Sequence, residues 1–127
     1  MKTKFTLDDL LPDVYLFHSP EKFRAFYKVF SGSDLDRDLT MYSGFHTTGP
    51  YKNKLISLVY LDNDPKRSLI GDYTILIHEA THVKQALMDF YDEKKMGRDS
   101  EAIFQEYLSK SLMRAHKKWL KKKGIKK

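Results

Sequence analysis

Two histidines and a glutamate near the middle of the chain have the types and the spacing that metal-assisted hydrolysis requires. His78, Glu79 and His82 form the pattern His-Glu-x-x-His. Residues four apart lie one turn above each other on one face of a helix, so both imidazoles can bind a single metal ion. The glutamate points to a different part of the helix surface, beside the metal, where a carboxylate can act as a base on a metal-bound water.

The residues around this motif predict the helix that it needs. Apolar residues recur every three or four positions and form one stripe, which is typical of a helix that faces a core. We expect the helix to begin between Lys66 and Asp72 and to run to about Tyr91. The two histidines fall on the opposite side from the stripe, so they face a groove or a second layer. The stripe consists of Leu69, Tyr73, Leu76, Ala80, Val83, Leu87 and Phe90.

Several shorter elements precede the motif helix. Ser19 and Pro20 are a strong helix start, and Gly32 ends a helix of about ten residues. Residues 54–61 are apolar on both faces and predict a strand in the interior of a sheet. Residues 40–47 predict its hairpin partner, with Gly44 marking a bulge or a close backbone approach, and residues 48–51 read as the turn. Residues 6–11 predict one short turn of helix, residues 14–18 a brief extended piece, and Phe23, Phe26, Tyr27 and Phe30 a core-facing aromatic row.

The C-terminal part predicts a second long helix. Residues 92–97 read as a charged loop, after which Asp99 or Ser100 can cap the helix. Its apolar face consists of Phe104, Leu108, Leu112, Ala115 and Trp119. Together these elements predict an α+β fold, in which a small twisted sheet of about two to four strands packs against the motif helix and the C-terminal helix. Residues 1–127 are expected to form one domain.

The composition limits what the chain can be. With 127 residues, 41% of them hydrophobic, it can bury a modest core. It contains no cysteine, so disulfides and thiolate zinc ligands are excluded and His, Glu and Asp must build any metal site. No apolar run reaches the roughly 18 residues of a membrane span, and the first residues lead into acidic ones. We therefore expect no membrane association and a cytoplasmic location.

The positive charge is concentrated at one end. The formal net charge is +6, and seven lysines but no acid lie within residues 117–127, so the rest of the chain is nearly neutral. Lysines favour the negative end of a helix macrodipole, so the simplest interpretation is a solvated helix end. The alternative is contact with nucleic acid or an acidic partner. The residues that would make it are Lys117, Lys118, Lys121, Lys122 and Lys123.

A catalytic zinc ion takes three protein ligands and keeps one position for water or substrate. Glu101 is the predicted third ligand, because it stands early on the helix that a short loop would fold back antiparallel to the motif helix. Its ordinary role would be that of a first-turn carboxylate favoured by the helix dipole. The competing candidates are Glu106, Asp89, Asp92, His46 and His116.

Residues 78–82, followed by a glutamate on a second helix, resemble the zincin metallopeptidases, in the gluzincin-like branch with two histidines and one glutamate as ligands. The resemblance covers roughly residues 40–110 and is closest in scale to small zincins of phage and bacterial genomes. Glu101-Ala102-Ile103-Phe104 is similar to the start of their second helix. It implies a minimal zincin-like fold, in which an edge strand lines the cleft and pairs with an extended substrate. Residues 42–47 would be that strand.

The resemblance also implies a mechanism. Zn²⁺ held by His78, His82 and Glu101 would activate a water that hydrolyses a peptide bond of a peptide or protein substrate, and Glu79 would be the general base. A donor is needed for the oxyanion that develops. The candidates are His116, Tyr107, His46 and Tyr73.

A second function class remains open at this point. The same motif can belong to a zincin-like protein that binds zinc for structure or serves as an adaptor, without turnover. The presence of Glu79 disfavours this alternative, because a structural site has no use for a base. A fourth protein ligand would favour it. A separate alternative is a nucleic-acid-associated protein that uses the basic tail.

Overall fold

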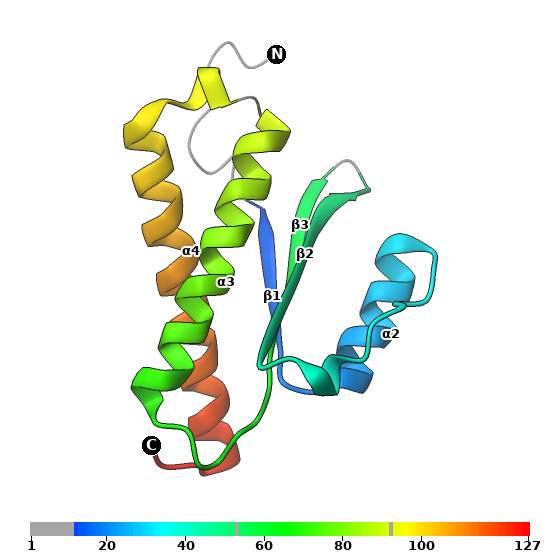
Figure 1. Ribbon diagram of the computed structural model, residues 1–127, viewed down its shortest axis with the longest axis vertical. Helices are drawn as coiled ribbons and strands as arrows, with labels where there is room; N and C mark the ends of the chain where they lie inside the picture. Colours follow the sequence, from blue (N-terminus) through cyan, green and yellow to red (C-terminus); the bar gives the residue numbers. More distant parts are fainter. Residues whose placement is uncertain (1–11, 53, 92) are drawn as a thin grey trace.

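The computed structural model describes residues 12–52, 54–91 and 93–127, which form an α+β arrangement of a three-stranded sheet between two helical layers (Figure 1). Helices α3 and α4 lie side by side on one face of the sheet, and α2 packs against the other. The predicted fold class is therefore confirmed. The elements in chain order are β1 (Asp13–Phe17), α2 (Pro20–Ser31), a 3-10 turn (Leu39–Met41), β2 (Gly44–Tyr51), β3 (Lys54–Leu61), α3 (Leu69–Tyr91) and α4 (Glu93–Lys123).

Strand β3 is the centre of the sheet, with β1 parallel on one side and β2 antiparallel on the other. Successive side chains of a strand point to opposite faces, so a strand covered on both sides must be apolar throughout. This explains the continuous apolar sequence of residues 54–61 and confirms its predicted interior place. On the α3 and α4 face lie Leu55, Val59 and Leu61, and on the α2 face Ile56, Leu58 and Tyr60.

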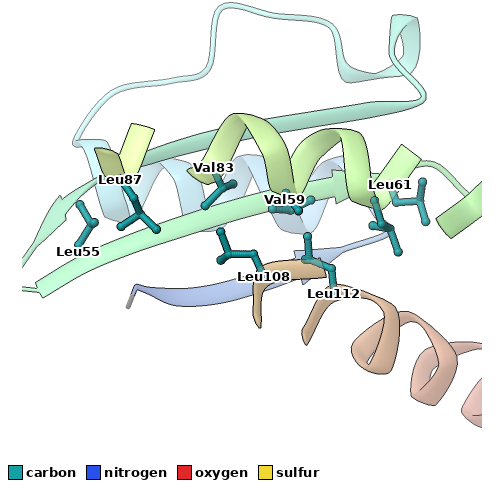
Figure 2. Close-up of a cluster of buried hydrophobic side chains, with 9 residues drawn as sticks. Leu55, Val59, Leu61, Val83, Leu87, Leu108 and Leu112 are labelled. Atoms are coloured by element: carbon teal, nitrogen blue, oxygen red, sulfur yellow. The ribbon is translucent and has the colours of Figure 1, made fainter. Parts of the chain in front are cut away.

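The main core lies between β3 and the two long helices. Figure 2 shows leucine and valine side chains from all three elements in contact there. The apolar stripe predicted for the motif helix forms this contact from Tyr73 to Leu87, whereas Leu69 lies outside the cluster and Phe90 is 55% exposed. From α3 the core contains Leu76, Ala80, Val83 and Leu87, and from α4 Leu108 and Leu112.

Helix α2 begins and ends where its sequence signals predict. The Ser19 side chain accepts a hydrogen bond from the backbone N–H of Lys22, and Gly32 takes a left-handed φ of 77° at the C-terminal end. Phe23 is fully buried against the sheet, and the other members of the aromatic row pack around it. The predicted core role of this row is confirmed.

The hairpin forms as predicted, but its strand boundaries were wrong. The Asp38 side chain accepts a hydrogen bond from the backbone N–H of Thr40 and caps a 3-10 turn, so the strand begins only at Gly44. Strand β2 then continues through the predicted turn to Tyr51. Pro50 is tolerated because β2 is an edge strand, where a missing backbone N–H costs no ladder hydrogen bond.

Helix α4 begins at Glu93, six residues before the predicted cap, so the predicted charged loop is wrong for residues 93–97. Glutamate, lysine and methionine are good helix formers, and one internal glycine costs only about 1 kcal/mol relative to alanine. The helix then runs back antiparallel to α3, as expected (Figure 1). Phe104, Leu108 and Leu112 are buried on its inner face, whereas Ala115 is exposed.

Two further expectations concern the ends of the described chain. The extended piece at residues 14–18 is β1, which pairs with β3 from Asp13 to Phe17. The short helix predicted at residues 6–11 lies outside the described residues. A search of the described helices finds none with the length and apolar character needed to cross a membrane.

Candidate functional site

The two histidines of the motif point outward from α3 and meet at its surface. The Nε2 atoms of His78 and His82 are 3.0 Å apart, and both lie on the side of α3 away from the buried Leu76 and Val83. Their ring centroids are 4.6 Å apart. The helical spacing predicted from the sequence is thus realised, and it brings the coordinating nitrogens of both side chains together.

Glu79 lies inward of this pair, between α3 and the edge strand β2. Its side chain is 7% exposed, and its Oε2 atom is 3.1 Å from Nδ1 of His46 on β2. An ionised carboxylate can only accept hydrogen bonds, so beside it Nδ1 of His46 carries the proton and donates it. The His46 ring is also stacked on that of His82, with centroids 5.0 Å apart and planes 2° from parallel.

The register of the hairpin explains why His46 faces α3. His46 is the cross-strand partner of Val59, whose side chain is in the core beneath α3, and paired residues point to the same face of a sheet. Two residues earlier, Gly44 lets the backbone approach the helix. A Cβ atom there would lie 2.7 Å from Ile75 Cγ2 and 3.0 Å from Glu79 Oε1. The close backbone approach predicted for this glycine is therefore confirmed.

Glu101 lies on the other flank of α3. Its Oε1 atom is 3.0 Å from Nζ of Lys84, which follows His82 by two residues. At about 100° per residue, two positions correspond to roughly 200° around a helix. Because α4 packs along one flank of α3 and β2 along the other, Glu101 meets Lys84 whereas His82 meets His46.

The other candidate ligands are distributed over the molecule. Glu106 is paired with Lys110 on the outside of α4, Asp89 is exposed on α3, and Asp92 lies outside the described residues. His46 is the candidate that the structure brings to the histidine pair. Within the described ranges no group of three or more His, Cys, Asp or Glu side chains is arranged to hold a metal ion.

His116 belongs to a separate, buried polar network at the N-terminal end of α3. Asp72 is fully buried, and its Oδ2 atom accepts from Nε2 of His116 and Nζ of Lys127, each at 2.8 Å, while Oδ1 accepts from Nε of Arg67 at 2.6 Å. Burial alone would raise the pKa of Asp72, but hydrogen bonds from these basic partners outweigh it and lower the pKa. The carboxylate is therefore held ionised.

The network continues from His116 to His18 at the end of β1. Their ring nitrogens are 2.9 Å apart, and the His18 ring is stacked on Trp119 with centroids 3.7 Å apart. Burial and the neighbouring His116 lower the pKa of His18 from 6.5 to about 3, so its imidazole is neutral at physiological pH. Of the other predicted oxyanion donors, Tyr73 packs edge-on against His116, and Tyr107 is exposed on α4.

The sequence pointed to His46 as a candidate ligand but not to its contact with Glu79. The available signal was its place one residue after Phe45 in a strand: if Phe45 faces the α2 side, His46 must face α3. Comparison of the chain with protein-family models, curated proteins and solved structures finds no match in any of the three. The function is therefore argued from the geometry of the site.

Proposed function

We propose that this protein is a zinc-dependent peptidase whose metal is held by the histidine pair of α3. The observation that carries the proposal is the 3.0 Å separation of the Nε2 atoms of His78 and His82 on an outward helix face. Zinc–nitrogen bonds of 2.0–2.1 Å at a tetrahedral angle put two ligating nitrogens about 3.3 Å apart. The distance between the two nitrogen atoms is therefore close to that between two ligands of one tetrahedral zinc ion.

When bound, zinc supplies a Lewis acid that polarises a carbonyl group and lowers the pKa of water toward neutrality. Glu79 is the general base. Because His46 donates to Oε2, the second carboxylate oxygen, Oε1, is the one that accepts a proton from the attacking water and delivers it to the leaving amine. His46 thereby fixes the orientation of the carboxylate before substrate binds, which reduces the cost of positioning it.

Two residues compete for the place of the third ligand. Glu101 remains our prediction, and it would have to exchange Lys84 for the metal. His46 is the competitor that the contacts favour, because its ring already lies against His82. Zinc titration of Glu101→Gln and His46→Phe compares the two residues. Loss of a residue that only supports a ligand typically weakens zinc affinity 10- to 100-fold, and loss of the ligand itself weakens it at least as much. The variant with the larger loss of zinc affinity therefore identifies the third ligand.

The proposal is tested by metal analysis together with hydrolysis of fluorescein-labelled casein. Protein purified without chelator is expected to hold close to one zinc per chain and to lose activity on metal removal. Glu79→Gln should retain the metal and lose hydrolysis, while Asp36→Asn, in an exposed loop, should change neither. Equal hydrolysis by the Glu79→Gln variant would remove Glu79 from the mechanism.

A non-catalytic zinc protein is the second candidate, and one observation favours it. Glu79 is buried and already hydrogen-bonded by His46, as in a site whose carboxylate serves structure. The two candidates differ in coordination: a catalytic ion keeps a position for water, whereas a structural ion is closed by four protein ligands. Cobalt-substituted protein that shows four protein ligands, with no cleavage of casein or of a fluorogenic peptide library, would establish the second.

A further inference from the structure

The outer surface of α4 carries a row of cations that the peptidase does not use. Arg114, Lys117, Lys118 and Lys121 line one shallow hollow of about 290 Å³, and all four side chains are exposed. We call these four residues the α4 basic stripe. Their hollow is apolar because the methylene stems of long basic side chains form its walls while the charged heads extend into water.

The stripe lies on the side of α4 away from the main core, and Lys117 and Lys121 at its edge also line a hollow with Leu69 and Leu120. At about 100° per residue, the four positions of the stripe centre roughly 150° around the helix from the buried Leu108 and Leu112. This part of α4 packs against the rest of the protein, because Leu120 and His116 on its inner face are also buried. The charges thus lie on the outer side of a helix whose inner side is buried.

The stripe is not neutralised by the protein itself. Glu106 is the last acidic residue of the sequence, and its carboxylate is paired with Lys110. Lys84 and Lys127 are likewise paired with carboxylates. In contrast, no member of the stripe forms an ion pair with any residue in the described part of the chain. Four adjacent uncompensated cations favour an anionic partner.

We propose that the α4 basic stripe binds the phosphate backbone of a nucleic-acid duplex. From Arg114 to Lys121 the helix rises about 10 Å at 1.5 Å per residue. One strand of a duplex carries a phosphate every 3.4 Å of axis, so the stripe spans roughly three phosphates. Cations at spacings of three and four residues, about 4.5 to 6 Å along the helix axis, place several positive charges beside such a row of phosphates.

The aromatic residue of this segment favours a duplex over a single strand. Proteins that bind single strands stack exposed bases on aromatic side chains. Trp119 is the one aromatic residue between Arg114 and Lys121, and its ring is stacked on His18 at 3.7 Å. A bilayer is disfavoured too, because a helix lying on a membrane needs large apolar side chains beside its cations. Between Arg114 and Lys121, Leu120 is buried and the Trp119 ring is stacked on His18.

The test is fluorescence anisotropy with a labelled 20-base-pair DNA duplex and the full chain, over a series of salt concentrations. Truncation after Arg114 would also remove His116 and Leu120 from the buried interior, so substitution is the cleaner change. We expect duplex binding whose logarithmic affinity falls linearly with the logarithm of salt concentration. The slope should be about −2 to −4, since each phosphate contact contributes roughly −0.9.

The triple variant Arg114→Gln, Lys117→Gln, Lys121→Gln should lose about tenfold or more in affinity at low salt and most of its salt slope. The control Lys28→Gln, Lys52→Gln, Lys66→Gln removes the same charge from exposed positions elsewhere and should stay within about threefold of wild type. Zinc content and casein hydrolysis should be unchanged in both variants, which separates this proposal from the proposed peptidase function.

Three results would overturn the proposal. The first is no salt-dependent duplex binding by the wild-type chain. The second is an equal loss of affinity in the stripe and control variants, which would show attraction by net charge alone. The third is stripe-dependent binding to phosphatidylserine vesicles, or to an unstructured single strand, that exceeds binding to the duplex.

Discussion

Two polar clusters lie on the same helix, and they differ in how their charges are satisfied. At the N-terminal end of α3, Asp72 receives hydrogen bonds from three basic side chains, and its carboxylate is fully buried. Near its middle, His78 and His82 face each other at the surface, with Nε2 atoms 3.0 Å apart and no carboxylate between them. Buried polar groups with complete partners stabilise a fold, whereas imidazole nitrogens that converge near solvent are suited to binding a metal ion once both are deprotonated.

The difference between the clusters is tested most strongly at Asp72. Asp72→Ala should lower the free energy of unfolding by about 3 kcal/mol, because it leaves the buried Lys127 ammonium without a carboxylate and leaves Arg67 with Asp62 alone. Urea denaturation measures the change. Asp89→Ala, at an exposed position of the same helix, should cost less than about 0.5 kcal/mol. A similar small loss at both positions would show that the Asp72 network does not support the fold.

The histidine pair should behave in the opposite way. His78→Ala removes an exposed side chain, so in the absence of zinc it should change stability by less than about 0.5 kcal/mol. At free zinc one hundred times the dissociation constant, the wild-type chain should gain about 2.7 kcal/mol, and the variant should gain little. Thermal or urea unfolding with and without zinc measures both. Equal zinc stabilisation of the two proteins would place the metal elsewhere.

The local part of this contrast was predictable from sequence, and the non-local part was not. Spacing alone put His78 and His82 together, and capping residues alone placed α2. The Asp72 network joins residues 44 and 98 positions apart, and no local signal encodes such contacts. The flank on which α4 packs also depends on the whole core, which is why the sequence could predict Glu101 near α3 but not its pairing with Lys84.

His46 combines features of both clusters, because its ring is stacked on His82 of the exposed pair and its Nδ1 atom is hydrogen-bonded to the buried Glu79 carboxylate. His46→Leu leaves the buried Glu79 carboxylate without its donor and should cost about 1 to 2 kcal/mol. His46→Asn places an amide N–H near the position of Nδ1, so it should restore most of this stability and of the casein hydrolysis. If Asn and Leu were equally impaired in both measurements, the hydrogen bond to Glu79 would have no separate role.

The smallest expected effect concerns His18, at the far end of the Asp72 network. Its pKa is about 3 in the folded protein, against the 6.5 of a solvated histidine, so between these values the unfolded chain binds more protons than the folded one. Its contribution is therefore fully present above pH 6.5 and is lost as the pH falls toward 3.

His18→Phe keeps an aromatic ring against Trp119 but cannot titrate. Its unfolding free energy, measured by urea titration from pH 7 to 4.5, should fall less steeply than that of wild type. The difference should be a fraction of the roughly 1.4 kcal/mol per pH unit that one whole proton contributes, because the ring is partly exposed. Lys22→Gln, beside the same ring, should keep the wild-type slope, and an unchanged slope in His18→Phe would show that the imidazole titrates normally in the fold.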